Sequence, residues 1–203
     1  MPVNHIVKTG EHLPAIAASY GYATIDPIWK AKANADLAKI RDPHQLLAGD
    51  VLVIPDKDDV KYGRPINQLH KFVVDLESLH LKLAVSSFDT KNPLDDTNAT
   101  LDIGDRSVPV SLDAVDETVA RTDTAATLTN GEIALKLRIG GLDPPESDSG
   151  VDMRLMNLGY MLMADDDQER TLAVEEFQVD NGLTVTGTVD DATRAKLVEV
   201  HGV

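Results

Sequence analysis

The sequence predicts a multidomain α+β protein made of three small modules. Apolar residues follow a strand, helix, helix, strand pattern up to residue 57, alternate with polar residues from 68 to 142, and return to helical spacing after 143. A chain of 203 residues has room for two or three small domains. We therefore expect domains at 1–57, 68–142 and 143–203, with a charged linker at 58–67.

The first module begins with a predicted strand at residues 5–8, which Gly10 ends. A helix follows from residue 13 to 20, and a second helical stretch runs from 26 to 40 with Asp26 as its cap. Its apolar face would carry Trp29, Ala33, Leu37 and Ile40 into the core. Residues 51–55 form the closing strand, so the predicted order is βααβ.

Motifs at both ends of this module resemble the LysM domain. They are Val7-Lys8-Thr9-Gly10-Glu11-His12-Leu13, Ile16-Ala17, Tyr20-Gly21, Leu46, Gly49-Asp50, Leu52 and Ile54-Pro55. The resemblance implies a shallow groove that binds glycans containing N-acetylglucosamine. By position, the groove would be lined by Gly10, Glu11, His12 and Leu13, facing Leu46, Leu47, Ala48 and Gly49. His12 stands where the family usually has Thr or Ser.

The middle region predicts a small antiparallel β-sandwich. Short alternating strands are expected at 72–74, 79–85, 99–103, 107–112 and 133–139, with turns at 89–94 and 103–106. His70 and His80 lack a third ligand at metal-binding spacing, so we interpret both as ordinary residues. The region is either a spacer or a docking surface.

The final module predicts three helices. The first covers 152–158, and the second begins at Gln168 or Thr171 and ends at Gly182, which can adopt a left-handed C-cap. Asp190 caps the third helix, whose apolar face would include Ala192, Ala195, Leu197 and Val198.

This module resembles the small three-helix peptidoglycan-binding domain of bacterial cell-wall enzymes. The matching residues are Arg154-Leu155-Met156-Asn157-Leu158-Gly159-Tyr160, Ala173-Val174, Phe177-Gln178, Gly182-Leu183, Val185-Thr186-Gly187, Val189-Asp190, Thr193 and Leu197. The resemblance implies noncatalytic wall binding. Its ligand residues would be Phe177, Gln178, Asn181 and Thr186.

The composition restricts the partners. A net charge of −15 argues against nucleic acid or an anionic membrane as a partner, and fourteen acidic against four basic residues lie in 143–203. Cysteine is absent, and the acidic run 165–167 lacks the spacing of an EF-hand, so we expect no metal and no cofactor.

The first residues do not resemble a signal peptide, and no segment is long enough to span a membrane, which predicts cytoplasmic synthesis.

The leading hypothesis is a noncatalytic protein that binds peptidoglycan or a chitin-like glycan. We find no acid/base pair or metal site that a hydrolase would need. The module order, with the phrase at 141–144 and 154–160, resembles proteins encoded with contractile injection systems such as type VI secretion. It implies an accessory or cargo with a spike or baseplate partner, delivered to the periplasm or outside the cell. The alternative is a protein-docking adaptor that binds no sugar.

Overall fold

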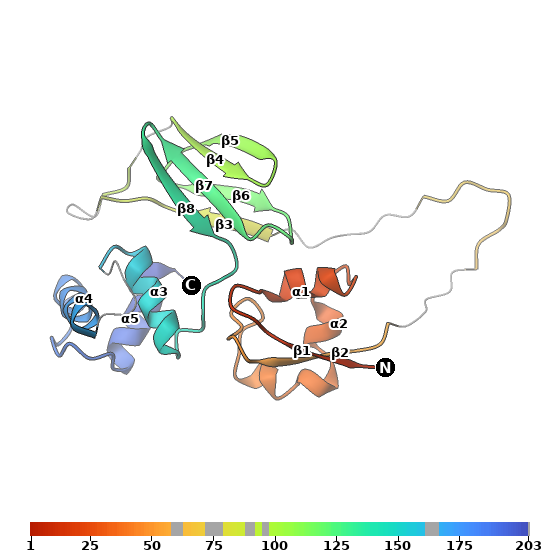
Figure 1. Ribbon diagram of the computed structural model, residues 1–203, viewed down its shortest axis with the longest axis horizontal. Coiled ribbons are helices and arrows are strands. Elements are labelled where there is room, and N and C mark those ends of the chain that lie inside the picture. Colours follow the sequence, from red (N-terminus) through yellow and green to blue (C-terminus); the bar gives the residue numbers. More distant parts are fainter. Residues whose placement is uncertain (58–62, 72–78, 88–91, 95–97, 161–166, 203) are drawn as a thin grey trace.

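The chain folds into a mixed α and β structure with antiparallel sheets and a helical C-terminal region (Figure 1). The structure, a computed structural model, describes residues 1–57, 63–71, 79–87, 92–94, 98–160 and 167–202. Within these ranges no helix is long and apolar enough to cross a membrane.

The first module pairs its two strands around a helical core. Strand β1 (Val3–Ile6) lies antiparallel to β2 (Val51–Ile54), and α1 (Leu13–Ser19) and α2 (Asp26–Trp29) follow β1 in the chain. Gly21, with φ of 73°, follows α1 in the left-handed conformation that glycine adopts most readily. The core contains Val7, Leu13, Ile16, Ala17, Ile25, Ile28, Leu46, Leu52 and Ile54. The element order matches the predicted βααβ pattern, while the LysM resemblance stays a prediction.

The predicted long second helix is wrong. Residues 26–40 form α2 and two 3₁₀ turns, η1 (Lys32–Asn34) and η2 (Leu37–Lys39). Trp29 packs against the core as expected, but Ala33 and Ile40 are exposed. The cause is Asn34, whose buried side-chain amide binds the carbonyls of Ile28 and Val53 and the N–H of Val53, each at 2.8 Å. Tying the turn to β2 breaks the helical repeat.

The middle domain contains two antiparallel sheets. One pairs β3 (Leu79–Leu83) with β6 (Val115–Val119). The other has the order β5 (Arg106–Val110), β4 (Ala99–Ile103), β7 (Ala125–Asn130), β8 (Ile133–Arg138). Both sheets contribute to one core, in which Leu101 and Leu128 meet Val115 and Val119. This is the two-sheet arrangement that strand alternation predicts.

Two strands of this domain were not predicted. In β6, acidic residues separate Val115 from Val119, and β7 is rich in Ala and Thr, so neither has a strong apolar alternation. The turn at 103–106 is confirmed, with Gly104 at φ of 55° and Ile103 paired with Arg106. The strand expected at 72–74 and residues 89–91 of the turn expected at 89–94 lie outside the described residues.

The C-terminal module contains α3 (Asp148–Asn157), α4 (Asp167–Asp180) and α5 (Asp191–His201). Its core is Val151, Leu155, Ala173, Val174, Phe177 and Leu197. Asp190 caps α5 as predicted, accepting the N–H of Thr193 at 2.8 Å. The expected inward face of α5 is wrong at Ala192 and Ala195, which are exposed, because Thr193 is buried there. Residues 165 and 166 of the acidic run lie outside the described residues.

Replacing Asn34 by Ala is expected to destabilise the first module by about 2–4 kcal/mol, because one N–H and two carbonyl groups would lose their buried partner. Trp29 is the only tryptophan and lies in this module, so urea unfolding followed by its fluorescence reports this module. Asn4→Ala, at an exposed position of β1, is the control and should change little. Equal losses for both variants would contradict the assigned role of Asn34.

Candidate functional site

The two loops predicted to form the glycan groove lie side by side in the first module. The backbone N–H of Gly49 donates to the carbonyl of Val7 at 2.8 Å, and the N–H of Val7 donates to that of Asp50 at 2.9 Å. The Asp50 carboxylate accepts the N–H of Leu47 at 2.9 Å and Nε of Arg41 at 3.0 Å, which fixes the second loop. The strand pairing thus brings the two predicted sets of residues together.

Not all eight groove residues present their side chains outward. Leu13 and Leu46 belong to the module core and can support a surface only from below. Ala48 and Gly49 are exposed, and Gly10, Glu11 and Leu47 are partly so. His12 is buried and caps α1, its Nδ1 accepting the N–H of Ala15 at 3.4 Å.

The Glu11 carboxylate is already engaged within the module. Its Oε2 accepts the Lys8 N–H at 2.9 Å and lies 2.9 Å from Nε2 of His5. Burial raises the pKa of Glu11, but the Lys8 N–H and the His5 ring outweigh it, so this pKa lies below its ordinary value. Glu11 therefore stays ionised and fixes the loop that carries Gly10.

The predicted residues of the C-terminal module are also close together. Gln178 lies in the core and its Oε1 accepts the N–H groups of Thr186 and Gly187, at 2.8 and 3.1 Å. Its Nε2 donates to the hydroxyls of Thr186 and Thr193 and to the carbonyl of Thr188. One buried amide therefore shapes the whole turn between α4 and α5.

Phe177 lies fully inside this module, against Tyr160 in an edge-to-face contact with ring centroids 5.4 Å apart. Asn181 donates from Nδ2 to the Phe177 carbonyl at 2.9 Å and closes α4. Phe177 and Gln178 are thus internal supports in this structure. Thr186 is exposed and Asn181 partly so, and they lie with half-exposed Val185 on the outer surface of the turn.

A segment whose contact with the first module the sequence did not predict links all three modules. We call residues 139–146, between β8 and α3, the connector; it passes beside the loops of the first module (Figure 1). A side chain on Gly140 would collide with the His12 ring, and one on Gly141 would lie 3.7 Å from the Gly10 Cα. The connector therefore packs against half of the predicted groove.

Arginines hold this arrangement together. Arg154 of α3 is fully buried and donates from Nη1 to the carbonyls of Asp143 and Gly150, at 2.9 and 2.8 Å, and from Nη2 to Oε1 of Gln45 at 3.4 Å. Arg121 donates from Nη1 to the carbonyls of Tyr22 and Ala23, both at 2.8 Å. The sequence signal for this role was an arginine at position 154, next to the inward-facing Leu155 in the helix predicted at 152–158.

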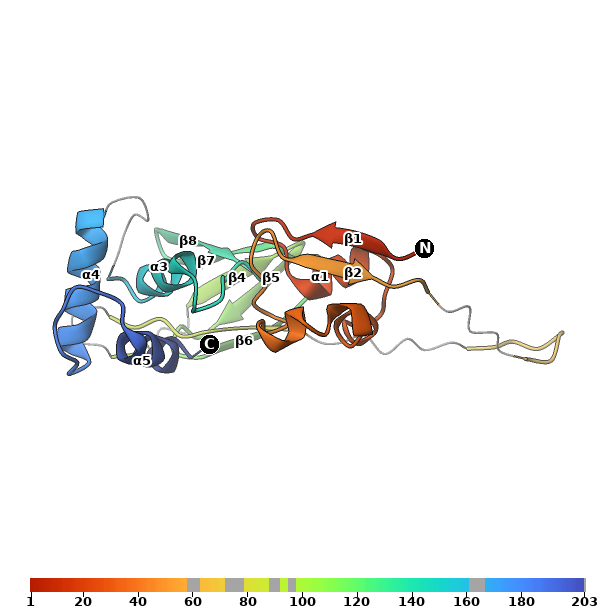
Figure 2. The same ribbon diagram turned by 90° about the horizontal axis from the view of Figure 1, so that it is seen from below.

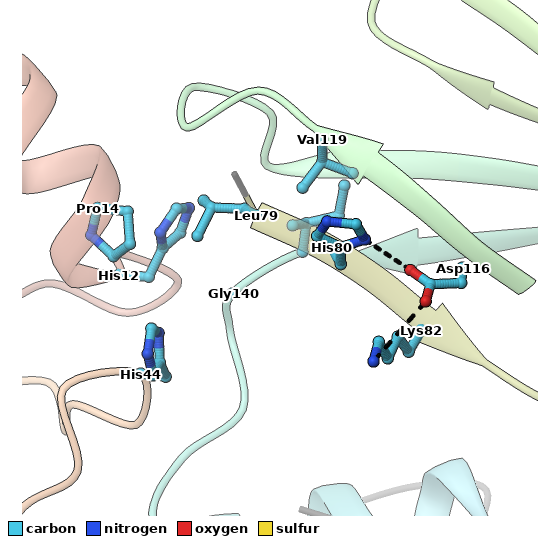
Figure 3. A pocket seen from close by; sticks show the side chains of 10 residues that line it. His12, Pro14, His44, Leu79, His80, Lys82, Asp116, Val119 and Gly140 are labelled. Carbon is cyan, nitrogen blue, oxygen red and sulfur yellow. Dashed lines mark hydrogen bonds and ion pairs between the residues drawn. The ribbon is translucent and has the colours of Figure 1, made fainter. Parts of the chain in front are cut away.

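An open cleft of about 430 Å³ lies where the first module, the connector and β3 meet (Figure 3). His12, His44 and Gly140 line one side, and His80, Lys82 and Asp116 the other. Asp116 lies 2.6 Å from Nδ1 of His80 and 3.7 Å from Nζ of Lys82. Across the described part of the chain, no three His, Asp or Glu side chains are placed to hold a metal ion.

The folded protein is expected to lose stability as the pH drops below about 6.5, the ordinary pKa of a histidine side chain. Burial and then the neighbouring His44 lower the pKa of His12, against an opposing backbone contact with Asp123. Protonation of His12 is therefore less favourable in the folded than in the unfolded protein. The stability that neutral His12 contributes is fully present above its ordinary pKa and is lost as the pH falls below that value. The other titratable side chains that line the cleft are those of His80, Lys82 and Asp116.

The measurement is the melting temperature followed by Trp29 fluorescence at about pH 8 and about pH 5.5. His12→Gln keeps an acceptor for the Ala15 N–H but does not titrate, so its melting temperature should fall less than that of the wild type. The same fall in melting temperature for both proteins would contradict the assignment of this pH dependence to His12.

Replacing Gln178 by Leu is expected to destabilise the C-terminal module by about 2–4 kcal/mol, because the N–H groups of Thr186 and Gly187 would be left unsatisfied. Gln168→Leu, at an exposed position on the same helix, is the control. The stability of both variants is measured by urea unfolding, with helix content followed by circular dichroism. If Gln178→Leu is as stable as Gln168→Leu, the turn does not depend on this amide.

The comparison with protein families finds a match in the C-terminal module. Residues 151–197 match the model of a family described as a putative peptidoglycan binding domain. No curated protein and no solved structure matches the chain. The family match covers most of α3, all of α4 and most of α5, including the turn that Gln178 builds. It makes peptidoglycan binding the function suggested for this part of the chain.

Proposed function

We propose that this protein binds peptidoglycan without cleaving it and that its C-terminal module makes the main contact. The observation that carries this proposal is the family match over residues 151–197. The turn after α4 is its candidate contact surface, because Asn181, Val185 and Thr186 reach solvent over a fixed backbone. Such preorganisation limits the entropy lost on binding.

The first module is proposed as a second, weaker site for N-acetylglucosamine units. The support is the LysM resemblance and the adjacent placement of the loops that carry Gly10 and Gly49. Two weak sites in one chain raise the apparent affinity for a repeating polymer by raising the effective concentration of the second site. This assignment also predicts that chitin-like oligomers are ligands.

We further propose that the protein acts as an accessory or cargo of a contractile injection system, with a spike or baseplate protein as partner. The support is the combination of the three modules and the joining sequence at 141–144 and 154–160. Delivery by such a system would bring the protein to the periplasm or the cell exterior, where peptidoglycan is accessible.

A protein-docking adaptor that binds no sugar is the second candidate, and charge favours it. Residues 143–203 contain fourteen acidic and four basic side chains, and peptidoglycan itself carries carboxylates. Like charges repel, so a basic protein surface would suit this module better than an anionic polymer. A stable complex with a spike protein, together with no binding to sacculi, would select this candidate.

Sedimentation with purified sacculi tests the main proposal. Val185→Asp adds a negative charge beside the exposed turn and should weaken binding about tenfold, a loss of about 1.4 kcal/mol. Ile133→Asp, an equally drastic change on exposed β8 of the middle domain, is the matched control and should bind as the wild type does. Wild-type protein that stays in the supernatant would refute wall binding.

The salt dependence of sedimentation is a further test. Because the module and the polymer are both acidic, raising the ionic strength from low to physiological should screen their repulsion and strengthen binding. Binding that weakens over the same range would show that attraction between opposite charges dominates, which this charge distribution does not predict.

A further inference from the structure

We propose that the connector is an internal occupant of the glycan groove in the first module, so that this module binds glycan only after the connector has moved away. The inference rests on the glycan binding proposed above for the first module. The new element is that the connector and the sugar compete for the same groove.

The first argument is the close backbone approach at glycine positions. A Cβ on Gly140 would lie 2.2 Å from Cδ2 of His12, and one on Gly141 would lie 3.7 Å from Cα of Gly10. Gly10 and His12 are two of the predicted groove residues. A sugar ring in contact with either would need the space that the connector fills.

The second argument is that polar bonds hold the first module to both domains that the connector joins, and that one of these groups also binds the connector itself. At the β-domain end, Arg121 binds the carbonyls of Tyr22 and Ala23. At the helical end, Arg154 reaches the Asp143 carbonyl and Gln45 together. Arg154 therefore ties the connector to the first module, and Arg121 holds the β domain beside the same module.

The third argument is that the part of the connector beside the groove, residues 140–143, belongs to none of the three hydrophobic cores, so it can move while Ile139 stays in the core of the β domain. Open clefts of about 430 and 310 Å³ flank it, one beside His12 and His44 and the other beside Gln45 and Pro144. The second groove loop stays exposed at Ala48 and Gly49. A glycan can therefore contact this exposed loop first and displace the connector afterwards.

The test compares two glycine variants in the full-length protein, with a chain of four N-acetylglucosamine units as probe and calorimetry as readout. Gly140→Ala collides with the His12 ring and should release the connector. Gly131→Ala also has a positive φ, in the turn between β7 and β8, but its Cβ meets nothing within 4 Å. It therefore reproduces the backbone strain without the collision.

We expect Gly140→Ala to bind the probe about tenfold more tightly than Gly131→Ala and the wild type, the change expected if about one molecule in ten is open in the wild type. Equal binding by the two variants would overturn the inference. Trp29 fluorescence during unfolding verifies that the first module is folded in each protein.

A second variant tests the same inference without changing any groove residue. Gln45→Ala removes the first-module side chain that accepts from Nη2 of Arg154, so the connector is held less firmly and the probe should bind more tightly than to the wild type. Probe binding equal to that of the wild type would overturn the inference, even if Gly140→Ala fails to fold.

Sacculus sedimentation separates this inference from the proposed function. If the wild type sediments with sacculi but neither Gly140→Ala nor Gln45→Ala binds the probe, the inference fails and wall binding by the C-terminal module stands. If Gly140→Ala binds the probe while the wild type stays in the supernatant, the inference stands and wall binding by the closed protein fails.

Discussion

The arrangement of the modules depends on one buried cation, Arg154. Its side chain has no exposed surface, so its charge must be compensated inside the protein. Burial lowers the pKa of Arg154, and the nearby carboxylates of Glu146 and Asp143 oppose that shift. Because its partners lie in α3, the connector and the first module, the same group stabilises the helical core and fixes its neighbours.

The helical module shows what a sequence pattern predicts well. Gly182 has the predicted left-handed conformation and Asp190 is the predicted cap, because both follow from local backbone chemistry. Thr193 was missed as a core residue because its burial depends on a distant partner, the Gln178 amide. The Phe-Gln motif, predicted to touch ligand, instead builds the surface from below.

In the first and middle modules too, the features missed from sequence depend on contacts between residues distant along the chain. Alternation predicted β4 and the turn to β5, whereas β6 and β7 gain their strand character from neighbours across the sheet. Asn34 ended a predicted helix through bonds to β2, nineteen residues away at Val53. The candidate groove loops could be located from sequence, but the contact that the connector makes with them could not, since no local pattern encodes a contact between modules.

The contacts between modules have a consequence for evolution. Arg121 and Arg154 donate chiefly to main-chain carbonyls, those of Tyr22, Ala23 and Asp143, and Arg194 donates to the carbonyl of Pro145. A carbonyl is present whatever the side chain, so the accepting positions are free to drift, while the arginines are not. Homologues should therefore retain the arginines without correlated changes at the positions that accept from them, and covariation would detect little of this interface.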